Sequence, residues 1–139
     1  MSESQQVLVV RTPGRGLTDI SARVADIVSD ARVGTGLCTV FCQHTSASLL
    51  IQENASRDAA HDLMAWLERI APDGDPAYTH TDEGPDDMPA HLRAAVTNTS
   101  ETIPVVEGRL ALGTWQGLFL VEHRTSGSSR RVVVHVSGS

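Results

Sequence analysis

The sequence predicts an α+β domain built on a mostly antiparallel sheet of about six or seven strands with two or three helices. Two observations support this fold class. In the last third of the chain, β-branched and apolar runs follow one another without a helical pattern between them. Earlier in the chain, helical patterns occur between strands but do not alternate with them regularly, which disfavours a parallel α/β sheet. A chain of 139 residues can bury its own core, so we expect a single domain over residues 1–139.

The first part of the chain predicts a strand followed by a helix. The β-branched run "QQVLVVRT" at 5–12 is typical of a strand, and "PGRG" at 13–16 predicts a turn. Apolar residues then recur at helical spacing, with Thr18 or Asp19 in position to act as the N-cap. Gly34 follows the last of these residues and predicts the end of the helix.

The middle of the chain predicts two strands, a second helix and a long loop. Residues 37–45 carry apolar side chains on both faces, which indicates a central strand, and 48–54 predict a short strand or an extended segment. An amphipathic helix then begins at a Ser56 N-cap and ends at Pro72. The acidic segment 73–88 is rich in turn residues, and a loop of this length in a small domain is usually functional or mobile.

The C-terminal part predicts a short helix and then only strands. Pro89 lies in the first turn of the helix, with Asp86 or Asp87 as its cap. The glycine after Glu107 predicts a turn between two strands. The strand signals are "ETIPVV", "RLALG", "TWQGLFLVEHR" and "RRVVVHVSG", and valines alternate with other residues in the last of these.

Charge and composition restrict the classes of partner. The net charge is −6 and the chain has no Lys, which disfavours nucleic-acid binding because that requires clustered basic residues. No apolar run approaches the roughly 18 residues of a membrane span, and no basic region precedes the N-terminal apolar stretch. We therefore expect a cytoplasmic protein without nucleic-acid or membrane partners. Its 11 Arg residues still allow a small anionic or phosphorylated ligand.

The two cysteines, Cys38 and Cys42, are interpreted as small buried apolar residues. Four residues apart on a strand, their side chains would be roughly 13 Å apart, which is too far for a disulfide. The alternative is a nucleophilic role for Cys42, two residues before His44.

Three of the six histidines are candidates for chemistry. His44 ends a predicted central strand and is followed by a cluster of hydroxyl side chains. His91 follows Asp87 by four residues near the predicted start of a helix, where backbone N–H groups favour an anion. His123 ends a later strand. The other three are interpreted as surface or half-buried side chains: His61, His80 and His135.

Residue types and spacing leave several roles open for this set. His and Asp are ligands for Zn²⁺ and other divalent ions. The same groups transfer protons near neutral pH, bind phosphate, or serve only as structural hydrogen-bonding groups. A Ser–His–Asp triad that uses Ser46 is disfavoured, because the chain lacks the G-x-S-x-G elbow.

Several long motifs resemble the YjbQ-like family, whose members are also called secondary thiamine-phosphate synthases. The motifs are "QHTSASLLIQENA", "DEGPDDMPAHLRAA", "TIPVVEGRLALGTWQG" and "VEHR" followed by "SRRVVV", and the resemblance extends from about Val7 to Val136. It implies an α+β fold, a homotrimer and a pocket near the subunit interface. Carried over by position, the catalytic residues, and tentatively the metal ligands, are His44, Asp87 and His91. The implied substrate-binding residues are Thr45, Ser46, Asn54, Trp115 and Gln116.

The resemblance implies weak thiamine-phosphate synthase activity, which joins a pyrimidine-methyl diphosphate to a thiazole phosphate. Loss of diphosphate requires neutralisation of the leaving group by a divalent metal, Mg²⁺ or Zn²⁺, or by Arg and helix N-termini. Asp86, Asp87 and Glu53 are the candidate acids, His91 the proton donor, and Arg93 and Arg124 the candidate clamps. We expect the main substrate to be another phosphorylated or anionic metabolite, because the chain has no Gly-rich phosphate loop. The alternative is a trimeric module that binds a metal or an anion without catalysis.

Overall fold

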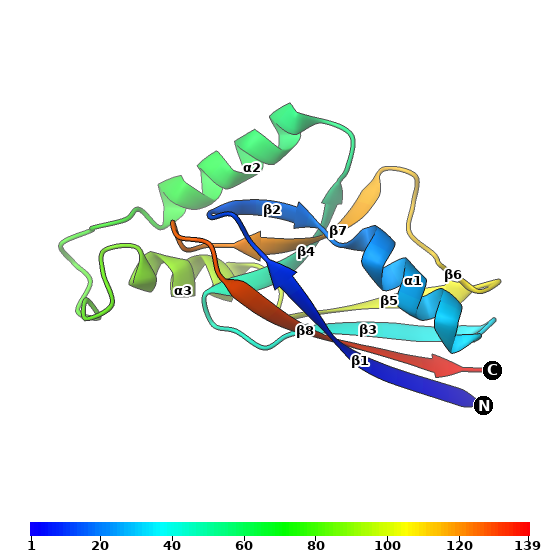
Figure 1. Ribbon diagram of the computed structural model, residues 1–139. Coiled ribbons are helices and arrows are strands. Elements are labelled where there is room, and N and C mark those ends of the chain that lie inside the picture. Colours follow the sequence, from blue (N-terminus) through cyan, green and yellow to red (C-terminus); the bar gives the residue numbers. More distant parts are fainter.

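The computed structural model describes residues 1–139, and its strands form two antiparallel sheets (Figure 1). The five-stranded sheet has the order β1 (Ser2–Arg11), β8 (Ser129–Gly138), β3 (Gly36–Cys42), β5 (Ser100–Val106) and β6 (Arg109–Leu110). The three-stranded sheet has the order β2 (Gly16–Asp19), β7 (Gln116–Glu122) and β4 (Ala47–Glu53). The three helices are α1 (Ser21–Ala31), α2 (Arg57–Ile70) and α3 (Asp87–Val96).

The structure confirms the predicted α+β class and corrects two details near the N-terminus. A short strand, β2, pairs with β7 in the segment that the sequence assigns to a turn and a helix cap. Its sequence "GLTD" has no β-branched apolar residue, so it carries little strand signal. Helix α1 consequently begins later, after Ile20, and the carboxylate of Asp19 accepts a hydrogen bond from the N–H of Ser21 (2.8 Å) instead of capping the helix.

The main core lies between the inner face of the five-stranded sheet, helix α1 and one face of the β4–β7 pair. The predicted alternation in the last strand is confirmed, since Val132, Val134 and Val136 are fully buried there. Both cysteines are free and buried in this core, as the sequence predicts. Helix α1 contributes Val24 and Val28 to the core, where it covers part of the inner face of the five-stranded sheet.

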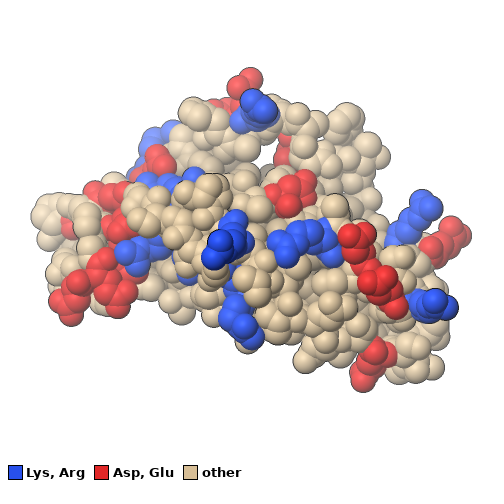
Figure 2. All heavy atoms as spheres, in the orientation of Figure 1, with Lys and Arg blue, Asp and Glu red and all other residues tan.

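The two other helices lie away from α1. Helix α2 begins as predicted, with the hydroxyl of Ser56 accepting the N–H of Ala59 (3.2 Å). Helix α3 contacts both α2 and β4. Together with the irregular segment 71–86, α3 lies at the end of the molecule opposite to both chain termini (Figure 1). On the face drawn in Figure 2, Arg side chains are interspersed with acids, and acidic side chains gather at the end that carries this segment.

The outer face of the five-stranded sheet carries a row of apolar side chains. Val133 on β8 is paired with Val7 on β1 and with Phe41 on β3, so these three side chains lie side by side across three strands. Val7 and Phe41 are each 45% exposed, although both belong to regular strands. None of the three helices is long and apolar enough to cross a membrane.

Candidate functional site

Three side chains from two segments converge at the start of α3. His80 comes from the segment 71–86, whereas Asp87 and His91 belong to α3. Oδ2 of Asp87 lies 2.8 Å from Nε2 of His80 and 3.0 Å from Nε2 of His91. All three potential ligand atoms lie within 4.8 Å of one another. The carboxylate is buried, and the two imidazoles are partly exposed, so the cluster can be reached from solvent.

Local structure explains why these groups meet. Residues four apart lie on the same face of a helix, so α3 aligns Asp87 with His91. The loop before the helix is tied back by Asp86, whose carboxylate accepts hydrogen bonds from the side chain of Arg124 and from the backbone and hydroxyl of Thr125. Arg124 also donates through NH1 to Oδ1 of Asp87 (2.7 Å). This arrangement orients the carboxylate and leaves its second oxygen, Oδ2, to the histidines.

The hydrogen-bond partners of His91 determine which of its ring nitrogens carries a proton. Nδ1 lies 2.9 Å from the backbone oxygen of Thr45, which can only accept, so Nδ1 must be the donor. In the neutral ring Nε2 is then unprotonated, and its lone pair faces Oδ2 of Asp87 at 3.0 Å. Two acceptors at this separation repel each other unless a second proton or a metal cation lies between them.

Asp87 is held in its anionic form. Burial raises its pKa, but the hydrogen bond from His80 and the positive charge of Arg124 are among the contacts that lower it more, so the net pKa shift is downward. The cluster therefore keeps a buried negative oxygen beside two imidazole nitrogens at neutral pH, which is the donor set that a divalent transition metal prefers.

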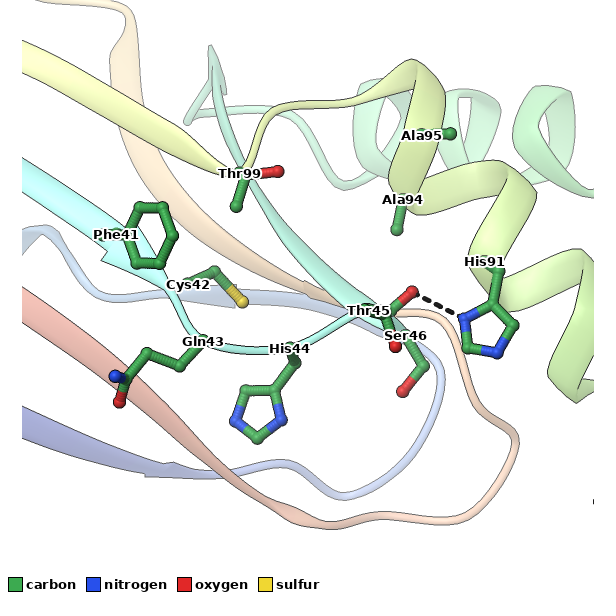
Figure 3. A pocket seen from close by; sticks show the side chains of 10 residues that line it. All are labelled: Phe41, Cys42, Gln43, His44, Thr45, Ser46, His91, Ala94, Ala95 and Thr99. Atoms are coloured by element: carbon green, nitrogen blue, oxygen red, sulfur yellow. Dashed lines mark hydrogen bonds between the residues drawn. The ribbon is translucent and has the colours of Figure 1, made fainter.

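A pocket of about 950 Å³ adjoins the cluster (Figure 3). His91 forms part of its wall and contacts Thr45 in the segment 43–46 that connects β3 to β4. Small-molecule sites in proteins commonly have volumes of about 300–1,000 Å³. Hydroxyl and imidazole groups line one side and methyl groups of α3 line another; the lining residues are Phe41, Cys42, Gln43, His44, Thr45, Ser46, His91, Ala94, Ala95 and Thr99.

His44 lines the same pocket but does not join the cluster. The chain leaves β3 after Cys42, and Nε2 of His44 accepts a hydrogen bond from the backbone N–H of Arg131 (2.8 Å). The third residue of the cluster is His80, whose sequence context predicts only a surface or half-buried side chain. The only sequence signal for His80 is its place in a long loop. The position of that loop is fixed by contacts of Arg124, which is distant in the sequence, so no local pattern points to His80.

The structure separates the expected substrate-binding residues into two groups. Thr45 and Ser46 line the pocket beside His91. Asn54, Trp115 and Gln116 meet at the opposite end of the β4–β7 pair, where the N–H of Asn54 donates to the oxygen of Trp115 (3.2 Å). The seven residues of β4 span roughly 20 Å between these ends. The two groups therefore do not share a pocket within one chain.

Two candidate polar residues, Arg93 and His123, are buried inside the structure. Arg93 is fully buried and donates to the backbone oxygens of Leu67, Ala71 and His123, so it braces α2 and α3 and is not free to clamp a ligand. His123 is also fully buried, and its Nε2 lies 2.9 Å from the hydroxyl of Ser48. Burial and the charge of Arg93 lower the pKa of His123 to about 4, so it stays neutral. This Ser–His pair is closed to solvent and lacks the carboxylate of a catalytic triad.

The thiol of Cys42 does not have the properties of a nucleophile. Its residue is 1% exposed, and burial raises the pKa of the thiol, which disfavours the thiolate at neutral pH.

The chain matches a known protein family. The family model described as "UPF0047 protein YjbQ-like" matches residues 5–139. A UPF0047 protein from Synechocystis is 52% identical over 136 residues, which are 98% of this chain and 92% of that protein. The UPF0047 protein YjbQ from Escherichia coli is 38% identical and covers 96% of this chain and 97% of its own.

Solved structures agree with this similarity. A hypothetical protein from Aeropyrum pernix superposes with a TM-score of 0.89 at 28% identity, covering 98% of this chain and 99% of its own. A YbjQ-like protein of unknown function from Sulfolobus solfataricus gives a TM-score of 0.86 at 26% identity and covers 99% of each chain.

Proposed function

The chain belongs to the YjbQ-like UPF0047 family, and from its site we propose a small-molecule enzyme that acts on a phosphorylated or anionic metabolite at a divalent-metal centre. The metal ligands in this proposal are Nε2 of His80, Oδ2 of Asp87 and Nε2 of His91. The observation that carries the proposal is the pair of acceptors on Asp87 and His91, which face each other at 3.0 Å while the other nitrogen of His91 is committed to a backbone oxygen.

The geometry fits a zinc-like ion. Zn–N and Zn–O bonds of about 2.0–2.2 Å in a tetrahedral site place neighbouring ligand atoms about 3.3 Å apart. The observed separations from Oδ2 of Asp87 are 2.8 and 3.0 Å, and all three ligand atoms lie within 4.8 Å of one another, so side-chain adjustment would be needed to seat the ion. The hydrogen bond from His91 to Thr45 and the one from Arg124 to Asp87 are the outer contacts that orient metal ligands in proteins.

Three protein ligands leave room for a substrate oxygen. A metal bound there would supply a Lewis acid that polarises a phosphoryl or carbonyl oxygen. The chain itself supplies a pocket beside His91, in which hydroxyl and amide groups can orient the polar part of the substrate. The methyl groups of Ala94 and Ala95 on α3 provide an apolar surface for its remaining part.

Two finer parts of the proposal come from the family resemblance. The first reaction to assay is thiamine-phosphate synthesis, here expected to be weak. The second is the homotrimer, which is supported by the exposed apolar row of Val7, Phe41 and Val133 on the outer sheet face. A trimer would also allow the residues around Trp115 in one copy to approach the pocket of another.

The test of this proposal is metal-dependent turnover. The protein is stripped with a chelator, reconstituted with Zn²⁺ or Mg²⁺, and incubated with thiamine-phosphate precursors and a panel of phosphate esters, with products followed by ³¹P NMR. We expect turnover that requires the metal and is abolished in Asp87→Asn. Stoichiometric metal without turnover of any substrate would instead favour the alternative, a non-catalytic metal-binding module.

A further inference from the structure

Two hydrogen-bond donors face each other at His44, on the other side of the pocket from His91. Nε2 of His44 accepts the backbone N–H of Arg131 (2.8 Å), and this donor cannot reverse its role. The neutral imidazole must therefore carry its proton on Nδ1. Nδ1 lies 3.4 Å from NH1 of Arg130, and a guanidinium nitrogen can only donate. The arrangement is thus the converse of the one at Asp87 and His91: here two donors converge without an acceptor.

The guanidinium of Arg130 is fixed in this position by the protein. Nε and NH2 donate to the two carboxylate oxygens of Glu122, and NH2 also donates to the backbone oxygen of Ser46 (3.3 Å). Glu122 is in turn saturated by the hydroxyl of Thr12 and the N–H of Arg124. NH1 is therefore the part of the guanidinium left without an acceptor, although the Arg130 side chain is only 7% exposed.

His44 stays neutral in this environment, which preserves the arrangement. Burial and the charge of Arg130 lower the pKa of His44, so the ring does not gain a second proton at neutral pH. The ring lines the pocket, and Figure 3 shows the side chains of His44 and Ser46 on the same side of the segment 43–46. A ligand oxygen beside His44 would therefore also be near a hydroxyl group that can donate.

We propose that Nδ1–H of His44 and NH1 of Arg130 form a phosphoryl-binding subsite in the pocket. One oxygen of a phosphate group would accept from both donors, and Ser46 would donate to a second oxygen. This inference rests on the proposed function and deepens it, because it names the group that the substrate presents opposite the metal centre. Arg130 and His44 are binding residues in this account, separate from the ligands His80, Asp87 and His91.

The tautomer of His44 is the first part of the test. Long-range ¹H–¹⁵N NMR spectra of the ring nitrogens distinguish a protonated Nδ1 from a protonated Nε2. We expect His44 in the Nδ1–H form and a change in its Nδ1 shift when inorganic phosphate is added in the presence of a chelator. The ring of His135, which lies on the outer sheet face and contacts Gln5, is the internal control. A protonated Nε2, or a His44 ring that does not respond to phosphate, would overturn the proposal.

Binding of inorganic phosphate to chelator-treated variants is the second part. Arg130→Lys keeps a cation beside Glu122 but removes NH1, and His44→Phe removes Nδ1–H. Each should weaken phosphate binding by at least about tenfold, since each removes a charge-assisted hydrogen bond. Arg131→Gln removes a neighbouring exposed charge without touching either donor, and it should change binding by less than about threefold. Circular dichroism confirms that each variant is folded.

The outcomes separate the two proposals. Equal weakening by Arg131→Gln would show general electrostatic attraction and overturn the subsite. Acetate binding as tightly as phosphate would assign the subsite to a carboxylate and overturn the phosphoryl assignment. Because metal is chelated throughout, these phosphate measurements would be the same if the protein had no metal centre. Conversely, the absence of a phosphoryl subsite would not change the Zn²⁺ affinities measured for wild type and Asp87→Asn.

Discussion

Asp86 and Asp87 are adjacent in the chain, yet their carboxylates face different partners. The carboxylate of Asp86 binds Arg124 and Thr125 and holds the loop before α3 against the β7–β8 connection. The carboxylate of Asp87 faces His80 and His91. Only Arg124 contacts both acids. Asp86 therefore has a structural role, and Asp87 is the acid available for chemistry.

Removal of the Asp87 charge should abolish metal binding and leave the fold intact. In Asp87→Asn, a neutral amide replaces the anionic ligand at nearly constant volume, so we expect Zn²⁺ affinity to fall by more than about 100-fold. Isothermal titration calorimetry measures the affinity, and Asp82→Asn, which neutralises an exposed acid in the same loop, is the matched control. Unchanged affinity in Asp87→Asn would remove Asp87 from the metal centre.

Asp86 should make the protein sensitive to acid. Burial raises the pKa of Asp86, but hydrogen bonds from Thr125 and Arg124 outweigh burial and lower this pKa from 3.8 to about 2. A depressed pKa in the folded state contributes stability above about pH 4, and this contribution is lost as the pH falls toward 2. The loss should be about 2 kcal/mol of unfolding free energy.

The measurement is chemical denaturation between pH 6 and pH 2. Asp86→Asn should lower the free energy of unfolding at pH 6 and flatten its fall in acid, relative to wild type. Asp62→Asn serves as the control, since the Asp62 side chain is 84% exposed. If the two variants have the same acid profile, the bonds of Asp86 do not stabilise the fold.

Phe41 should be needed for assembly if the outer face of the five-stranded sheet is the subunit interface. Phe41→Asp puts a charge at one end of the apolar row that Phe41 forms with Val133 and Val7, and burying that charge in an interface would be costly. We expect light scattering after size-exclusion chromatography to show a trimer for wild type and a monomer for this variant. Val96→Asp, at a residue that is 60% exposed on α3, should remain trimeric. A trimeric Phe41→Asp would place the interface elsewhere.

Trp115 should contribute little to stability, contrary to its large apolar side chain. The residue is 66% exposed in the connection before β7. Trp115→Ala should therefore lower the free energy of unfolding by less than about 1 kcal/mol. In contrast, Leu118→Ala, at a fully buried core position, should cost about 2–5 kcal/mol. Urea denaturation of both variants provides the comparison, and a large loss in Trp115→Ala would mean that the ring is covered in solution.

Local sequence patterns predict much of the fold, because strand alternation, helix capping and turn formation depend on residues that are close in the sequence. The valines of β8, the Ser56 cap of α2 and the glycine turn before β6 follow from alternation, capping and turn chemistry. The positions of Asp87 and His91 on one helix face follow from their spacing.

The remaining features of the fold and site depend on contacts between residues far apart in the chain, which leave no local pattern in the sequence. His80 enters the site because Arg124, far away in the sequence, holds its loop. His44 misses the cluster because the backbone of Arg131 engages its Nε2 after the strand has ended. The pairing of the polar strand β2 with β7 is likewise visible only in three dimensions.

The most direct test of the metal centre is native mass spectrometry of the intact protein with one equivalent of Zn²⁺ per chain added, combined with elemental analysis. The account predicts one ion per chain in wild type, and none in a His80→Ala, His91→Ala double variant that keeps its assembly mass. A wild-type protein that takes up no ion, or a double variant that binds as much as wild type, would contradict a metal centre at His80, Asp87 and His91.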